Sequence, residues 1–135
     1  MRWSLRRTVD RVTRRPSPRG IFGKMGESLA ERFLKKKGYE ILERNFRCPL
    51  GEIDLIAKEA GELVFIEVKT RQTTSFGFPE EQITWRKQKK LEQLAQFYLK
   101  RYRKEEPCRI DVVSILFNQT GKCVVIEVIP DAVSL

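Results

Sequence analysis

GEIDLIAKEAGELVFIEVKTR, residues 51–71, has the pattern of a β-hairpin. The first predicted strand covers residues 52–58, the second covers residues 63–69, and Glu59–Glu62 form the turn. β-Branched residues fill both arms, and Gly61 suits the turn. Because side chains alternate between the two faces of a strand, one face of the hairpin is entirely apolar. That face carries Ile53, Leu55, Ala57, Val64, Ile66 and Val68.

The opposite face of the hairpin brings two acids together. A turn centred in the middle of the predicted loop pairs Asp54 with Glu67 and Glu52 with Lys69. Directly opposed residues have Cβ atoms roughly 4.5–5.5 Å apart, so two carboxylates repel each other unless a cation lies between them. Oxygen ligands of this kind suit Mg²⁺ or Mn²⁺. Lys69 lies on the same face, where it can hold a nucleophilic water or neutralise charge on a phosphate.

The residues of this face also permit a second interpretation. Charged side chains on an antiparallel hairpin commonly mark the face in contact with water, and Glu52 and Lys69 would then be a surface ion pair. Ile56 and Phe65 share the face with the charged residues, so it is not simply hydrated. At the level of the residues, a metal site and a solvated face with ion pairs both remain open.

Several short motifs accompany the hairpin along the chain. Together, over about residues 23–129, they resemble the YraN family of uncharacterised bacterial proteins. Asp54 followed by Glu67-Val68-Lys69 is also similar to the D…(D/E)-x-K core of the restriction-endonuclease-like nucleases, although Ile53 stands where the superfamily pattern has Pro. The motifs are Gly23-Lys24-Met25-Gly26-Glu27, Arg44-Asn45-Phe46-Arg47, GEIDLIA, FIEVKTR, Phe76-Gly77 and Arg109-Ile110-Asp111-Val112-Val113.

The resemblance implies a Mg²⁺- or Mn²⁺-dependent endonuclease that hydrolyses DNA. On this basis Asp54 and Glu67 are expected to ligate the metal, with the Val68 carbonyl as a further candidate ligand. Glu27 is expected to be an additional acid supplied by the first helix, and Lys69 to be catalytic. The expected nucleic-acid contacts are Arg44, Asn45, Arg47 and Arg71.

The fold of the resembled nucleases suggests both a substrate and an alternative. By analogy with Holliday-junction resolvases, branched DNA and a homodimer are expected. A fold does not fix an activity, however. The alternative is an accessory protein that binds nucleic acid without cutting it.

Composition restricts the classes of function. The chain has 135 residues, which suits one domain with a substantial core. Its net charge of +9 favours a polyanionic partner, either nucleic acid or an anionic membrane surface. The absence of histidine excludes histidine-based triads and typical zinc sites. The odd number of cysteines (Cys48, Cys108 and Cys123) predicts reduced thiols in a cytoplasmic protein, and no apolar run spans a bilayer.

The first twenty residues form a basic arm that we separate from a domain at residues 21–135. Seven arginines, one aspartate and two prolines make up much of the arm, and it has no apolar segment of the secretory kind. This composition predicts disorder. The arm is expected to bind phosphates or an anionic membrane, or to act only as a solubilising tail.

Two helices are predicted. Residues 22–37 form the first, ended by Gly38, and Glu27 lies at the border of its buried face. Residues 79–104 form the second, after a loop in which Phe76 and Phe78 either stack on bases or cover the core. Lys87 falls inside the apolar stripe of the second helix. It therefore needs a partner, for which the site carboxylates are available, or must extend to solvent.

The remaining strands complete an α/β fold. Residues 39–46, 108–117 and 122–129 are the other predicted strands, which gives the order α-β-β-β-α-β-β. The long second helix permits a right-handed parallel crossover. The expected architecture is the restriction-endonuclease-like mixed sheet with a helix on each face. Asp111 interrupts a strand that is otherwise apolar, so it is expected to brace the structure, and Glu127 lacks an opposed acid and is not expected to form a site.

Overall fold

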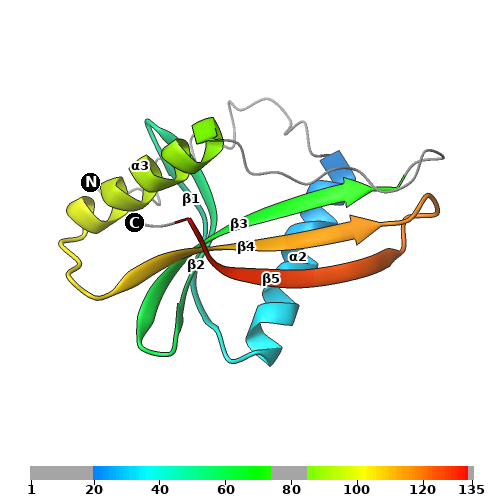
Figure 1. Ribbon diagram of the computed structural model, residues 1–135, viewed down its shortest axis with the longest axis horizontal. Helices are drawn as coiled ribbons and strands as arrows, with labels where there is room; N and C mark the ends of the chain where they lie inside the picture. Colours follow the sequence, from blue (N-terminus) through cyan, green and yellow to red (C-terminus); the bar gives the residue numbers. More distant parts are fainter. Residues whose placement is uncertain (1–19, 74–84, 134–135) are drawn as a thin grey trace.

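The computed structural model describes residues 20–73 and 85–133 (Figure 1). Residues 1–19 of the predicted basic arm, the loop with Phe76 and Phe78, and residues 79–84 of the second predicted helix lie outside the described residues. Gly20, assigned to the arm, is the first residue of a helix. The predicted order α-β-β-β-α-β-β is confirmed. Its elements are α2 (Gly20–Lys36), β1 (Glu40–Cys48), β2 (Gly51–Glu59), β3 (Glu62–Gln72), α3 (Trp85–Arg101), β4 (Cys108–Phe117) and β5 (Cys123–Val133).

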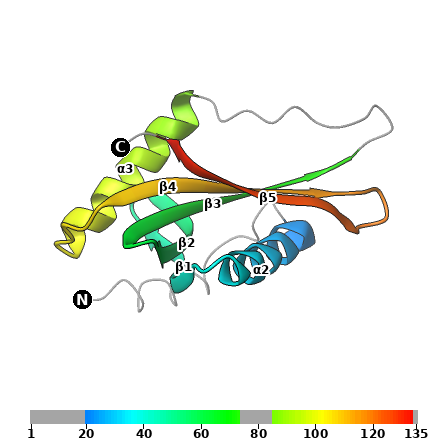
Figure 2. The ribbon, with the colours of Figure 1, turned by 60° about the horizontal axis from the view of Figure 1, so that its bottom comes forward.

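The five strands form one mixed sheet in the order β1-β2-β3-β4-β5. β3 and β4 are parallel and joined through α3, whereas the other neighbouring pairs are antiparallel. Figure 2 shows α3 and α2 on opposite sides of the sheet. β4 is buried along almost its whole length, because both of its faces are covered and both of its edges are paired. The predicted α/β architecture is therefore confirmed.

The predicted register of the hairpin is confirmed only next to its turn. Five consecutive pairs, from Glu59–Glu62 to Leu55–Ile66, have the predicted partners. Ala60 and Gly61 form the turn with positive φ angles of 52° and 78°, as a tight hairpin turn requires. The expected pair Glu52–Lys69 is wrong, because β2 and β3 stop pairing after Leu55–Ile66.

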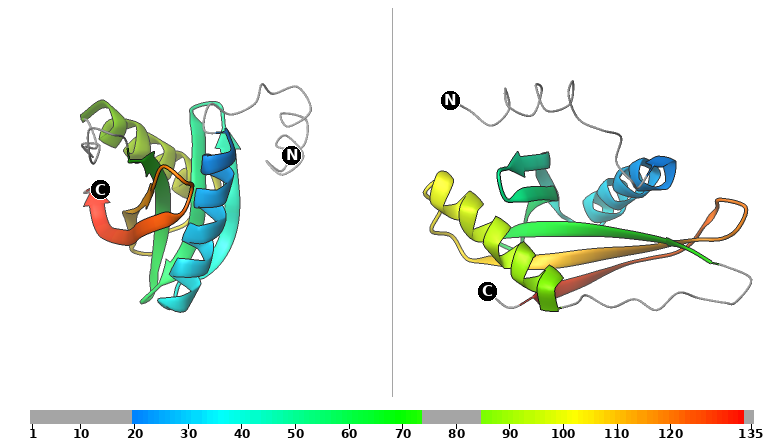
Figure 3. Two further views of the ribbon diagram at one scale, coloured as in Figure 1. Left: turned by 90° about the vertical axis from the view of Figure 1, so that its right-hand side faces the viewer. Right: turned by 90° about the horizontal axis from the view of Figure 1, so that it is seen from above.

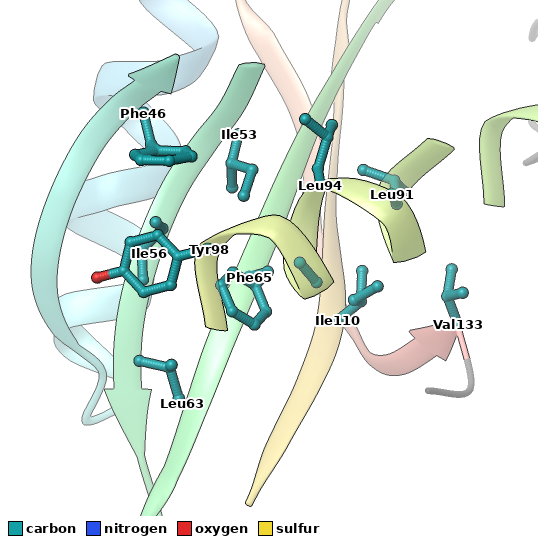
Figure 4. Close-up of a cluster of buried hydrophobic side chains, with 11 residues drawn as sticks. Phe46, Ile53, Ile56, Leu63, Phe65, Leu91, Leu94, Tyr98, Ile110 and Val133 are labelled. Atoms are coloured by element: carbon teal, nitrogen blue, oxygen red, sulfur yellow. The ribbon is translucent and has the colours of Figure 1, made fainter. Parts of the chain in front are cut away.

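The sheet separates two hydrophobic clusters. On the α2 side, Val64, Ile66 and Val68 from the apolar face of the hairpin pack with Ala30 and Leu34 of α2. On the α3 side, the ring of Tyr98 contacts the rings of Phe46 and Phe65 edge-on. These three aromatic side chains pack with apolar residues of the sheet and of α3. Figure 4 shows this cluster. Its labelled members are Phe46, Ile53, Ile56, Leu63, Phe65, Leu91, Leu94, Tyr98, Ile110 and Val133.

Alternation along the hairpin predicts Ile53 on the α2 side, but Ile53 lies in the α3 cluster. The strict alternation of side chains fails where β1 and β2 bend. Asn45 has a left-handed φ of 52°, and the ladder passes from Arg44–Leu55 to the next pair, Phe46–Ile53, skipping one residue on each strand. Asparagine tolerates this backbone conformation better than most residues.

Helix α2 approaches the sheet unusually closely. A Cβ atom on Gly26 would lie 2.1 Å from Thr70 Cγ2 of β3, so only glycine fits at this point of the present packing. The predicted end of the helix is confirmed: Gly38 has φ 97° and donates to the Lys35 carbonyl, and the Tyr39 amide donates to the Leu34 carbonyl. The close contact at Gly26 fixes the side of the sheet on which Glu27, the next residue of α2, lies.

Helix α3 ends at Arg101, three residues before its predicted end. Strand β5 ends at Val133, four residues after its own predicted end. Cys48, Cys108 and Cys123 are free thiols, as predicted. None of the helices in the described ranges has both the length and the apolar character that crossing a bilayer requires.

Candidate active site

The site predicted from sequence lies where β2 and β3 separate. Beyond the pair Leu55–Ile66, the remaining residues of β2 pair with β1, whereas β3 continues beside β4 as far as Gln72. We call the opening between residues 51–54 of β2 and residues 67–72 of β3 the β2–β3 fork. In Figure 3 the β1–β2 pair turns away from the long β3–β4–β5 layer. Separation of two paired strands leaves backbone groups that need new partners.

Asp54 supplies one of these partners at the fork. The Val68 amide of β3 donates to Asp54 Oδ2 at a distance of 2.8 Å, and Asp54 is 1% exposed. The carboxylate thus replaces a backbone carbonyl as the acceptor for β3. It also lies directly against the peptide bond that joins Glu67 to Val68. Asp54 therefore lies next to the backbone of Glu67 and Val68. The predicted cross-strand pair Asp54–Glu67 is wrong, because β2 and β3 stop pairing after Leu55–Ile66.

Glu67 is buried and forms an ion pair with a lysine of the protein. Glu67 is 5% exposed, and its Oε2 atom lies 2.8 Å from the Lys87 ammonium nitrogen of α3. Lys87 keeps 39% of its side chain exposed, so its stem crosses from the helix to the fork while part of the side chain remains in contact with water. Of the two alternatives for Lys87, the carboxylate partner is present, and the side chain also extends partly to solvent.

Lys69 and Glu27 approach the fork from two different elements. Lys69 is half-buried on β3 and is the register partner of Ser114 on β4, which is only 6% exposed. Glu27 is half-buried on α2. Because the preceding residue of α2 lies against Thr70, which follows Lys69, the turn of α2 that bears Glu27 covers the same part of β3. It does so from the α2 side of the sheet, whereas Glu67 contacts Lys87 on the α3 side.

The arrangement provides oxygen donors for a metal ion. No group of three or more His, Cys, Asp or Glu side chains in residues 20–73 and 85–133 is placed to hold one. The donors at the fork are two buried carboxylates, Asp54 and Glu67, and the nearby carbonyl of Val68. Two adjacent buried acids need positive charge, and oxygen donors suit Mg²⁺ or Mn²⁺. The residues therefore fit such an ion, provided that water completes its coordination.

Glu52 has a different partner from the one predicted. Its Oε2 atom accepts a hydrogen bond from Arg47 Nε at 2.8 Å, and the two residues are partners across β1 and β2. The expected interaction with Lys69 is wrong because Lys69 lies on the other side of the fork. As a consequence Glu52 belongs to the β1–β2 pair and not to the Asp54–Glu67 group.

Four residues were candidates for nucleic-acid contact. Arg47 pairs with Glu52, as described above, and the other three have different environments. Arg44 makes a two-point interaction with Glu31 of α2, through Nε at 2.6 Å and through Nη2. This contact joins α2 to β1, and we assign Arg44 to that structural role. Asn45 forms the bend in β1, and Arg71 is half-buried near the end of β3, where its Nη1 donates to the Thr70 carbonyl at 3.0 Å.

Asp111 braces the structure, as predicted. It is fully buried and accepts hydrogen bonds from the Tyr39 hydroxyl at 2.7 Å and from Arg109 Nε at 2.9 Å. Arg109 also pairs with Glu59 at 2.6 Å and with Glu62 at 2.7 Å. Burial, reinforced by the hydrogen bond to Asp111, raises the pKa of Tyr39 to about 12. The charges of this group are thus used within the protein.

A pocket of about 720 Å³ lies beside this brace, with Tyr39, Glu59, Glu62 and Arg109 among its lining residues. It occupies the turn end of the β2–β3 hairpin, whereas Asp54 and Glu67 lie at the fork end. The chemistry selects the fork, because only there do two buried acids, lysines and a sheet opening occur together in the described part of the chain.

Sequence reasoning missed three features near the fork: the Arg47–Glu52 ion pair, the buried Ser114, and Lys90 of α3. The Lys90 side chain lies over the start of β2, where a Cβ atom on Gly51 would be 3.4 Å from Lys90 Cε. The first had a usable signal, because centring a turn on Pro49 and Leu50 makes Arg47 the partner of Glu52. Lys90 and Ser114 had none. Their positions depend on how α3 and β4 dock, which is a tertiary property.

Comparison with known proteins gives one family. Residues 26–115 match the model of a family described as uncharacterised protein family UPF0102. A UPF0102 protein of Caldicellulosiruptor saccharolyticus is 48% identical over 112 residues, which cover 82% of this chain and 94% of that relative. A relative from Moorella thermoacetica is 45% identical over 111 residues, covering 82% and 92% of the two chains. One from Thermodesulfovibrio yellowstonii is 52% identical over 93 residues, covering 69% and 83%.

Proposed function

The chain belongs to the uncharacterised protein family UPF0102, also called YraN, and from the chemistry of its fork we propose that it is a metal-dependent endonuclease. The proposed reaction is hydrolysis of DNA phosphodiester bonds, at branched or damaged structures. One observation supports this most directly. Two buried acids, Asp54 of β2 and Glu67 of β3, border the opening in the sheet, and the Asp54 carboxylate binds the amide of the residue after Glu67. A lysine, Lys69, follows Glu67 by two residues.

Asp54, Glu67 and the Val68 carbonyl would hold Mg²⁺ or Mn²⁺. When bound, such an ion polarises the scissile phosphate and lowers the pKa of a coordinated water. Glu67 would exchange its contact with Lys87 for the metal, and the Lys87 ammonium would then be released toward the substrate. The Glu67 carboxylate would keep a neighbouring positive charge throughout, because the metal ion would replace the Lys87 ammonium group.

Lys69 would orient the attacking water and stabilise negative charge that develops on the phosphate. Its position supports this role, because it follows Glu67 by two residues on the strand that borders the fork. Glu27 would assist from α2 through a water molecule. The close contact between Gly26 and Thr70 supports this placement, since it brings that turn of the helix onto the same end of β3.

The proposed substrate follows from charge and from position. A net charge of +9 attracts a polyanion. Arg71 lies on β3, which borders the fork, and Asn45 and Arg47 lie on β1, which pairs with the other bordering strand, β2. A preference for branched DNA and a homodimeric assembly are part of the proposal by analogy of fold. The free thiols are consistent with a cytoplasmic location, which we also propose.

A second candidate is a nucleic-acid-binding protein without catalytic turnover. The Glu67–Lys87 ion pair favours it, because this acid is already compensated by the protein itself. In that case the fork would be a structural ion-pair group, and substitutions in it would leave nucleic-acid binding unchanged.

Cleavage of a set of labelled DNAs distinguishes the two candidates. Linear, single-stranded, flapped and four-way DNAs are incubated with the protein in Mn²⁺, Mg²⁺ or EDTA, beside the Glu67→Gln variant. The matched control is Glu127→Gln, which makes the same chemical change on the edge strand β5. We expect metal-dependent cleavage that Glu67→Gln abolishes and Glu127→Gln retains.

Cleavage that persists in Glu67→Gln would come from a contaminant and would count against the nuclease. Binding of DNA with no cleavage under any condition would select the second candidate.

A further inference from the structure

Glu67 lies where a negative charge needs a cation. It is 5% exposed, and its register partner on β4 is Val112, which is 2% exposed. Phe65, two residues earlier on the same face of β3, belongs to the hydrophobic cluster under α3. A carboxylate in such apolar surroundings is unfavourable unless a positive charge lies close to it. Ionised Glu67 therefore requires a cation whether or not a metal is bound.

The ammonium group of Lys87 supplies this cation, and the two partners of the ion pair differ in accessibility. Lys87 Nζ lies 2.8 Å from Glu67 Oε2, and the two side chains are 39% and 6% exposed, respectively. Because the lysine already reaches water, its head can leave the carboxylate by a change of side-chain torsions. Glu67 cannot follow, since β3 is paired with β4 from Leu63 to Gln72. The ion pair therefore opens through movement of the lysine.

Lys87 belongs to the part of α3 that precedes the contacts of this helix with the core. Among the described side chains of α3, Leu91 is the first member of the buried cluster (Figure 4). Lys87 lies about one turn before Leu91. Its contact with Glu67 thus joins the first turn of α3 to β3 without support from a neighbouring core residue on that turn.

Lys87 occupies an oxygen atom that a metal ion at the fork would need. Its nitrogen lies within hydrogen-bond distance of Glu67 Oε2, which is where a cation bound to this oxygen would have to lie. The positive charge of the ammonium group also opposes a second cation on the other oxygen of the same carboxylate. Metal binding at Glu67 is therefore linked to departure of the lysine.

We propose that Lys87 is an internal competitor of the metal, and that a nucleic-acid backbone relieves this competition. In the free protein the ammonium group holds Glu67 and lowers the affinity for Mg²⁺ or Mn²⁺. When a phosphate reaches the fork, the ammonium group moves from Glu67 to the phosphate, and the carboxylate becomes available. Metal and nucleic acid then bind cooperatively, and each raises the affinity for the other by the same factor. The identities of both ligands rest on the proposed function.

Lys90 separates the effect of contact from the effect of charge. It lies three residues after Lys87 on the same helix, where residues are neighbours on the helix surface. Lys87 contacts Glu67 on β3, whereas the Lys90 side chain lies over Gly51 at the start of β2. Removal of either lysine lowers the net charge by one. The proposal requires the two removals to differ in their effect on metal binding.

Binding of Mn²⁺ to the DNA-free full-length protein, followed through the electron paramagnetic resonance signal of unbound Mn²⁺, tests the competition. We expect Lys87→Gln to bind Mn²⁺ about fivefold more tightly than the native chain, because the competing cation is removed. Lys87→Arg keeps the charge and offers Glu67 a two-point hydrogen bond, so it should bind Mn²⁺ more weakly than the native chain. Lys90→Gln should bind Mn²⁺ as the native chain does.

A phosphorothioate oligonucleotide, which keeps the charge of the backbone and resists hydrolysis, tests the coupling. The Mn²⁺ titration is repeated with the oligonucleotide present, and the oligonucleotide alone gives the background. The native chain and Lys90→Gln should gain Mn²⁺ affinity by the same factor. Lys87→Gln should gain about fivefold less than the native chain, because its carboxylate has no competitor to lose.

Equal Mn²⁺ affinities of Lys87→Gln and the native chain would overturn the proposal. An equal increase in Lys87→Gln and Lys90→Gln would also overturn it, since net charge alone would then explain the result. Lys87→Arg retains a cation beside Glu67, so it tests the competition even if Lys87→Gln does not fold.

The measurement does not depend on cleavage, so the two proposals can fail separately. A chain that shows the competition but cuts no DNA would refute the proposed nuclease and support this inference. A chain that cuts DNA with Mn²⁺ but has the same Mn²⁺ affinity with and without Lys87 would do the reverse. Absence of Mn²⁺ binding in the native chain and in Lys87→Gln would overturn both.

Discussion

At the scale of single residues, Asp54 combines a structural and a functional role. Its carboxylate accepts a hydrogen bond from the Val68 amide and so links β2 to β3 where their backbone pairing has ended. The same carboxylate is buried next to the backbone of Glu67. From its position in the hairpin, Asp54 is either a metal ligand or part of a solvated face, and only the resemblance to the nucleases favours the ligand. The hydrogen bond could not be predicted, because that bond exists only where β2 and β3 cease to pair.

The Asp54→Asn substitution separates the two roles. The asparagine side-chain oxygen can still accept from Val68, whereas one of two neighbouring buried charges is removed. We expect the free energy of unfolding to be unchanged or higher, and metal-dependent cleavage to be abolished. Urea unfolding and the DNA cleavage assay measure the two effects.

Asp54→Ala is the comparison variant, since it leaves the Val68 amide without its acceptor and should cost about 1–3 kcal/mol. If Asp54→Asn were as unstable as Asp54→Ala, the separation of roles would be incorrect.

At the scale of secondary-structure elements, the docking of α2 depends on Gly26. Helix propensity alone predicts that Gly26→Ala stabilises the helix by about 1 kcal/mol. Steric contact predicts the opposite, because the added methyl group would meet Thr70 Cγ2 at 2.1 Å. We expect the steric effect to dominate and the variant to be less stable by about 1–3 kcal/mol, as overpacked sites are.

The double variant Gly26→Ala/Thr70→Ser tests this explanation, because serine lacks the methyl group that causes the clash. Thermal unfolding of the four members of this cycle should show that Thr70→Ser recovers most of the stability. Additive effects would show that α2 does not approach β3 at this point.

A second interaction between elements, Glu31–Arg44, predicts how stability depends on pH. The two-point hydrogen bond from Arg44 lowers the pKa of Glu31 from 4.5 to about 2. A pKa that is depressed on folding stabilises the native state above the unfolded-state value, and this contribution disappears as the pH falls from about 4.5 to about 2. Because Arg44 is 53% exposed, solvent screening limits the contribution to about 1 kcal/mol or less.

We therefore expect Arg44→Gln to be less stable than the native chain at pH 7 and equally stable near pH 2. Chemical unfolding measured across this range, in the chain and in the variant, gives the difference. A constant difference at all pH values would mean that the Glu31 charge does not contribute.

At the scale of the whole molecule, charge dominates the expected interactions. The net charge is +9, and residues 1–20 contain seven arginines and one aspartate. With no histidine, the charge of the chain changes little between pH 5 and pH 8. DNA affinity should therefore depend strongly on salt and only weakly on pH in this range.

Deletion of residues 1–19 tests the contribution of the arm. For every phosphate that the shortened chain no longer binds, the slope of log K against log salt should fall in magnitude by about 0.9 on duplex DNA. We expect the magnitude of this salt slope to fall by several units, and the unfolding temperature of the remaining domain to be unchanged. Titration of a labelled duplex gives the slope.

Vesicles with anionic lipids, measured in parallel, provide the alternative outcome. Weaker vesicle binding on deletion, with an unchanged DNA slope, would assign the arm to a membrane surface.

The sequence by itself determined the element order, the hairpin next to its turn and the helix end at Gly38. These follow from local rules of alternation, helical periodicity and turn chemistry, which act over a few residues. The tertiary structure alone decided that β2 and β3 separate after Leu55–Ile66, that Glu52 pairs with Arg47, and that Lys87 and Lys90 lie on opposite sides of the fork. The physical reason is that backbone pairing with β1 and β4, and the docking of α3 on both, compete with continued pairing of the hairpin. No local pattern in the hairpin records the outcome of that competition.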